Sequence, residues 1–157
     1  MRTESDVRAF HRKFGHPCPP LPRTPDPQWI RLRKRLIREE ARELCEAIDS
    51  GNLVKIAREC IDLVYVAVGT MVAYGLPMGR CWAAVQKANM AKLPAPPGEK
   101  PRKPPGWVSP DVEIEEVISE ANARVRDGNA IHGLLYALPF SLLFWAAAGW
   151  IAWRILT

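Results

Sequence analysis

The segment EEARELCEAIDSGNLVKIARECID, residues 39–62, decides the fold of this chain. Its centre, Asp49-Ser50-Gly51-Asn52, consists of residues that favour turns, and a stretch of helical length lies on each side. Neither stretch alternates between apolar and polar residues as a half-buried strand does. The segment therefore predicts an antiparallel helix hairpin that reverses close to Gly51.

Four carboxylates lie in register about this turn. Glu43 and Glu59 are each eight residues from Gly51, and Glu40 and Asp62 are each eleven residues from it. Because a helix rises about 1.5 Å per residue, the two members of each pair stand at matching heights. The hairpin is therefore expected to bring all four carboxylates to one patch between its helices.

Such a patch needs a positive charge. Asp62 is the only charged residue in residues 60–78, and we expect it to be buried. A buried carboxylate costs several kcal/mol unless it is paired or bound to metal, and clustered acids repel one another. A site with oxygen ligands alone suits Mg²⁺ or Mn²⁺ better than zinc. The alternative is salt bridging to the nearby basic residues Arg38, Arg42, Lys55 and Arg58.

Outward from the hairpin the pattern remains helical. Two proline-rich segments, residues 17–27 and 94–110, interrupt helix and strand alike. Between and around them the apolar spacing predicts helices over residues 7–14, 27–50, 53–74, 77–93 and 111–125. The last of these is mostly acidic and is expected to be solvated. The predicted fold is an all-α helical bundle.

The C-terminal part of the chain is different. Residues 131–153 contain no charged residue, and this length exceeds the roughly 20 residues that a helix needs to cross a bilayer. We therefore predict a single transmembrane helix; a very apolar packing helix is the alternative. The expected organisation is a helical domain over residues 1–111, an acidic helix and linker over residues 112–130, and the membrane span over residues 131–153.

The charge of the chain indicates the kind of partner it can bind, and the pattern around its cysteines indicates their redox state. Lys and Arg number 22 and Asp and Glu 17, a formal charge of +5 that favours anionic partners. The basic residues within residues 31–38 lack interleaved aromatic residues, so a solvated helix face is expected and nucleic acid is not. Cys45 and Cys60 lie in apolar helical patterns, which predicts reduced core cysteines.

Several motifs resemble one enzyme family. EEARE, residues 39–43, and ECID, residues 59–62, are similar to the EExxE…ExxD metal-binding pattern of the MazG-type all-α nucleoside triphosphate pyrophosphohydrolases. FHRKFG at residues 10–15, NMAK at residues 89–92 and KPPGWVSPD at residues 103–111 resemble segments of the small members often found in phage genomes. The resemblance covers about residues 7–111.

The resemblance implies an all-α subunit that forms a homodimer or tetramer and hydrolyses a nucleoside triphosphate with Mg²⁺. Glu40, Glu43, Glu59 and Asp62 would hold the metal. Glu39 points about 100° away from these ligands on an ideal helix and is assigned a catalytic, water-activating role. The candidate substrate-binding residues are Asn89, Lys92, Lys87 and Lys103 for the phosphates, and Phe10, His11 and Phe14 for the base. Ordinary core packing and a solvated helix end are the alternatives for these positions.

These inferences predict a membrane-anchored nucleotide pyrophosphohydrolase. Because nucleoside triphosphates and Mg²⁺ are cytoplasmic, the helical domain is expected on the cytoplasmic side of the membrane. Two other classes stay open, a non-catalytic nucleotide-binding or metal-binding module and a membrane-tethered interaction protein. Four acidic residues at ligand spacing argue against a purely interacting role, which needs no such set.

Overall fold

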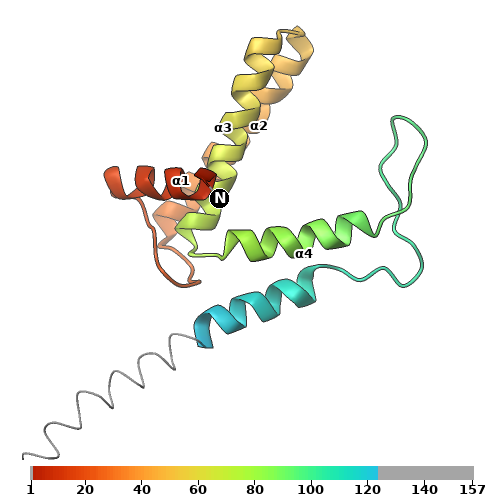
Figure 1. The fold of residues 1–157 in the computed structure, drawn as a ribbon. Coiled ribbons are helices and arrows are strands. Elements are labelled where there is room, and N and C mark those ends of the chain that lie inside the picture. The colour runs from red at the N-terminus through yellow and green to blue at the C-terminus, as the bar shows by residue number, and fades with distance from the viewer. Residues whose placement is uncertain (1, 124–157) are drawn as a thin grey trace, which may run out of the picture. The chain divides into compact units, whose positions relative to one another are not determined.

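The computed structural model describes residues 2–123 and is helical throughout that range apart from loops (Figure 1). The helices are α1 (Arg2–Lys13), α2 (Pro27–Ser50), α3 (Leu53–Ala73) and α4 (Met78–Met90), and residues 111–123 form a fifth. The nearest approach to a strand in these residues is an isolated bridge between Leu93 and Arg102. The predicted all-α fold is confirmed. The predicted membrane span, residues 131–153, lies outside the described residues.

Helices α2 and α3 form the predicted hairpin, and local chemistry fixes its turn. Gly51 ends α2 with φ of 66°, and its N–H donates to the Ile48 carbonyl at 3.0 Å. Asn52 begins α3, because its Oδ1 accepts from the backbone N–H groups of Val54 and Lys55, each at 3.1 Å. The reversal therefore falls at the predicted position, and Figure 1 shows the two helices side by side.

A small core forms where α1 crosses α3 near the open end of the hairpin. Val7 of α1 packs there with Val68 and Val72 of α3 and with Met78 at the start of α4. Gly75, with φ of 65°, turns the chain out of α3. Among the described residues, no single helix is long and apolar enough to cross a membrane; α3 and α4 together meet that test but bend by 119° at their junction.

Within residues 2–123, much of the apolar surface of the hairpin is left uncovered. Ile37 and Ile48 of α2 are exposed, and so are Cys45 and Cys60. The prediction of core cysteines is wrong for these two, because a two-helix layer with α1 at one end leaves its other side open. Further exposed apolar residues lie along α3: Leu53, Val54, Ile61 and Val64.

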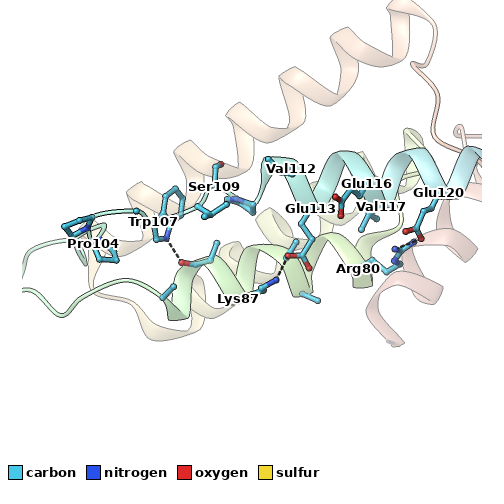
Figure 2. Close-up of a pocket in the computed structure, with 18 residues that line it drawn as sticks. Arg80, Lys87, Pro104, Trp107, Ser109, Val112, Glu113, Glu116, Val117 and Glu120 are labelled. Atoms are coloured by element: carbon cyan, nitrogen blue, oxygen red, sulfur yellow. Dashed lines mark hydrogen bonds and ion pairs between the residues drawn. The ribbon is translucent and has the colours of Figure 1, made fainter.

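The fifth helix was predicted to be solvated, and this prediction is wrong because the helix packs on α4. Val117 is buried, and the acidic side chains pair with α4: Lys87 with Glu113 at 2.9 Å and Arg80 with Glu120 at 2.8 Å. Trp107 Nε1 donates to the Ala88 carbonyl at 2.8 Å, which ties the preceding loop to α4 (Figure 2). These contacts frame a groove of about 840 Å³ along α4.

Candidate metal centre

Three carboxylates converge between α2 and α3. Glu40 and Glu43 lie one turn apart on α2, Glu59 comes from α3, and one oxygen of each lies within 4.8 Å of the others. A set of oxygen atoms this close together fits a hard divalent cation such as Mg²⁺ or Mn²⁺. The register about Gly51, argued from the sequence, accounts for this convergence.

Glu59 is the buried member of the set, with 5% of its surface exposed. Arg58 is its only ion-pair partner among the residues described; Nε donates to Glu59 Oε1 at 3.0 Å, and Nη2 contacts the same oxygen. Arg58 itself is largely exposed and takes its charge to the solvent side. The Glu59 carboxylate is therefore buried between the helices, and its charge is compensated by a guanidinium on the surface.

Asp62 was expected to be the buried acid, and that expectation is wrong, because Asp62 is only partly buried. Three residues on an ideal helix turn about 300°, so Asp62 lies about 60° around α3 from Glu59, toward the edge of the hairpin contact. Asp62 is not one of the three carboxylates that converge, although its charge acts on Glu40. Burial and, next, the charge of Asp62 raise the pKa of Glu40, and Glu43 contributes in the same direction.

The alternative of salt bridging is realised for part of the cluster. Arg42 pairs with Glu46 at 2.7 Å and with Glu43 at 3.5 Å, and Arg58 pairs with Glu59. Within residues 2–123, neither Glu40 nor Asp62 has an ion pair with a basic side chain. Arginines thus neutralise only part of the charge, and the remaining repulsion favours a bound cation.

Glu39 is exposed on α2, next to the cluster but outside it. This is the position that the 100° step along the helix predicts. Its carboxylate is one of the charges that raise the pKa of Glu40. Glu39 is therefore within electrostatic reach of the site without being one of the three converging ligands.

The predicted phosphate-binding residues lie elsewhere in the chain, on α4 and the loop after it. Lys92 Nζ donates to Asn89 Oδ1 at 2.7 Å, and Lys87 pairs with Glu113. Lys103 Nζ lies over the Trp107 ring, 4.2 Å from its centroid. In the described part of the chain, none of them forms an ion pair with the four carboxylates. Their role in substrate binding stays a prediction.

The predicted base-binding residues lie at the junction of α1 with α3. His11 is 1% exposed, and its Nδ1 lies 2.7 Å from the Pro17 carbonyl, so it packs inside the fold. Phe10 meets Tyr65 edge to face at 5.6 Å between ring centroids. Phe14 packs against Phe10 with the ring planes tilted by 46°, and more than half of its surface is exposed. Only the two phenylalanines present accessible rings.

Arg33 is the residue that sequence reasoning placed most wrongly. It was expected on a solvated basic face but is 6% exposed, and burial lowers its pKa. Its guanidinium lies on Gly69, where a Cβ atom would stand 2.6 Å from Nη1. Arg33 precedes Glu40 by seven residues, two helical turns, and this spacing was the available signal that both face α3.

Comparison with known proteins identifies the family of the chain. Residues 7–89 match the family described as phosphoribosyl-ATP pyrophosphohydrolase, and this match includes all four acidic positions. An uncharacterized protein of Acanthamoeba polyphaga mimivirus is 36% identical over 74 residues, which cover 45% of this chain and 30% of that protein. The chain therefore spans less than a third of that relative.

Proposed function

The chain belongs to the phosphoribosyl-ATP pyrophosphohydrolase family, within the MazG-like all-α superfamily, and on that premise we propose that it hydrolyses a nucleoside triphosphate to the monophosphate and pyrophosphate. The family acts on phosphoanhydride bonds of nucleotides, and MazG-like members generally use divalent metals. The observation that supports the proposal is the convergence of Glu40, Glu43 and Glu59 on one point.

The chemistry follows from the carboxylates. Mg²⁺ or Mn²⁺ bound by Glu40, Glu43, Glu59 and Asp62 would neutralise phosphate charge and lower the pKa of a bound water. Glu39, at the edge of the cluster, would accept a proton from the water that attacks the α-phosphorus. The water oxygen forms a bond to that phosphorus, and the bond to the bridging oxygen breaks, so pyrophosphate leaves with the electron pair.

The test is a product assay on the purified chain with the common ribonucleoside and deoxyribonucleoside triphosphates. We expect equal amounts of nucleoside monophosphate and pyrophosphate from at least one substrate. A chelator should stop the reaction, and added Mg²⁺ or Mn²⁺ should restore it. Release of orthophosphate instead, or turnover unaffected by the chelator, would contradict the proposal; tight binding without turnover would favour the non-catalytic module.

We also propose that the open face of the hairpin binds a second copy of the chain. Large apolar side chains on both α2 and α3 are exposed in the described chain, and exposed apolar surface of this kind marks sites of association. A version of the chain ending at Val125 should be a dimer or larger by light scattering at micromolar concentration. Ile61→Asp should shift it toward monomer, because a charge would enter the interface. A monomer before any substitution would refute this association.

A further inference from the structure

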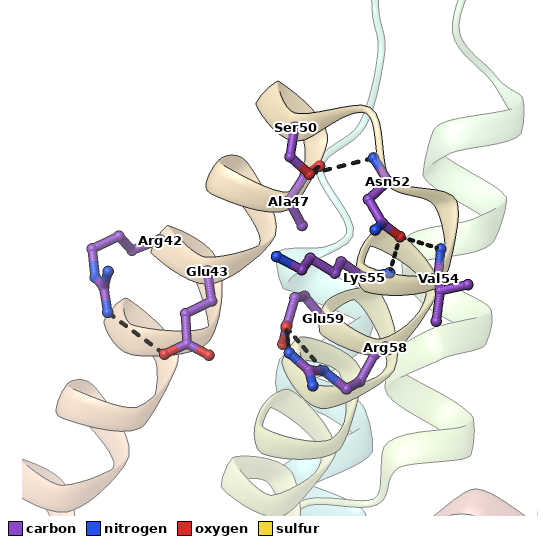
Figure 3. A network of polar contacts seen from close by, with 9 residues as sticks. All are labelled: Arg42, Glu43, Ala47, Ser50, Asn52, Val54, Lys55, Arg58 and Glu59. Carbon is purple, nitrogen blue, oxygen red and sulfur yellow. Dashed lines mark hydrogen bonds and ion pairs between the residues drawn. The ribbon is translucent and has the colours of Figure 1, made fainter.

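A second pocket lies between α2 and α3 toward the tip of the hairpin, with a volume of about 260 Å³. Glu43 and Glu59 line it, so it adjoins the candidate metal centre directly. Three basic side chains, those of Arg42, Lys55 and Arg58, also line it (Figure 3). None of these three belonged to the substrate-binding set predicted from the sequence.

The charges in this pocket cancel when no cation is bound. The three basic residues face three carboxylates, those of Glu43, Glu46 and Glu59. Each divalent cation held by Glu43 and Glu59 would add two positive charges. The metal-loaded pocket would therefore be strongly cationic, and its natural ligand is a compact polyanion.

Lys55 is the basic residue most available to such a ligand. It lies in the first turn of α3, four residues before Glu59, and Figure 3 shows its side chain reaching toward α2 across the pocket. Glu59 is engaged by Arg58, and in residues 2–123 no ion pair of the Lys55 ammonium is found.

Arg58 is the second basic residue available to such a ligand. Its guanidinium contacts the same Glu59 oxygen that a divalent cation would use. A cation on Glu59 would compete with Arg58 for that oxygen and release the guanidinium toward the pocket. Metal binding thus supplies both the positive charge and a second phosphate donor. Arg42 pairs with Glu46 at 2.7 Å, and because Glu46 is not one of the proposed ligands, a cation on Glu59 would leave this pair in place.

We propose that this pocket binds the two terminal phosphates of the nucleotide, with Lys55 and Arg58 as their donors. The proposal rests on the proposed function and specifies it, because the substrate would lie along the hairpin with its phosphates toward Asn52 and its nucleoside toward α1. Phe10 of α1 and Tyr65 of α3, whose rings meet edge to face at 5.6 Å, lie toward α1 and agree with that direction. A monophosphate product has no group for this pocket and would leave easily.

The test compares Lys55→Gln with the unchanged full chain in detergent. We expect inhibition by pyrophosphate in Mg²⁺ to weaken about 10-fold to 100-fold, the range that loss of one charge-assisted hydrogen bond gives. The kcat/KM for the triphosphate should fall similarly, and Lys55→Arg should recover part of it. Lys100→Gln, which removes an exposed lysine from the loop after α4, is the matched control and should change neither value.

The two proposals fail in different ways. Unchanged pyrophosphate inhibition in Lys55→Gln, with an active parent enzyme, would overturn the phosphate pocket and leave the hydrolase intact. If the parent chain hydrolyses no triphosphate, the proposed function fails, and calorimetry with pyrophosphate and Mg²⁺ then tests the pocket by itself. Binding that Lys55→Gln weakens would support the pocket even in that case, and equal binding would overturn it.

Discussion

Glu59→Gln should lower kcat/KM at least about 100-fold while the protein stays folded. A metal ligand that stabilises transition-state charge contributes several kcal/mol, and each 1.36 kcal/mol is tenfold in rate. Glutamine conserves the volume of the buried side chain, and the partner Arg58 is largely exposed, so the substitution leaves no unpaired charge buried. Steady-state kinetics with pyrophosphate release as the readout, together with a thermal melt, measure the two effects separately.

The matched control is Asp49→Asn, which removes an exposed acid near the end of α2 and should leave kcat/KM unchanged. Asp62→Asn should reduce hydrolysis like Glu59→Gln, because its charge acts on Glu40 within the same patch. Near-normal turnover in both variants would refute the assignment of this cluster as the metal centre. A similar loss in Asp49→Asn would show that the effect is one of general charge.

Gly75→Ala should be the most destabilising single-methyl substitution at the described glycines of positive φ. Gly75 has φ of 65°, and a Cβ there would lie 2.2 Å from the Leu21 carbonyl oxygen and 2.6 Å from its carbon. The left-handed conformation costs an alanine about 1–2 kcal/mol, and forcing apart packed backbone adds about 1–3 kcal/mol. The expected total is about 2–5 kcal/mol, a large share of typical domain stability.

Gly51→Ala separates these two costs. Gly51 has nearly the same φ, 66°, but no atom lies within 4 Å of the position of its Cβ. It should therefore lose only the conformational part, about 1–2 kcal/mol. Urea unfolding of both variants gives the difference. Equal losses would mean that the segment around Leu21 does not pack beneath Gly75 as the structure shows.

Local chemistry made the hairpin predictable. Gly51 and Asn52 mark the turn in the sequence, and the helix rise then sets which carboxylates face one another. The prediction that Glu40, Glu43 and Glu59 lie together needed only that turn and that rise. The bounds of α2 and α3 followed from proline, glycine and capping residues for the same reason, because each acts on backbone groups a few residues away. The prediction was less accurate for α1, which begins at Arg2 and not at residue 7, and for α4, which ends at Met90 and not at residue 93.

Burial was decided by the tertiary structure. The apolar pattern of α3 suggested that Asp62 is the buried acid, whereas the packing of α2 against α3 buries Glu59 and leaves Asp62 at the edge. Arg33 reads as one of several basic surface residues, yet Gly69, 36 positions later, provides the space that its guanidinium occupies. No local rule connects two such positions.

Four apolar residues of the hairpin are exposed although their sequence pattern suggested burial. Cys45, Cys60, Ile37 and Ile48 have apolar neighbours at helical spacing, which shows that a face is apolar but not what covers it. By itself the sequence determined the turn, the helices and the heights of the acidic residues, because these depend on contacts within a few residues. Only the tertiary structure decided which side chains are buried and which basic side chains face the acidic ones. Both depend on contacts between helices that are far apart in the sequence.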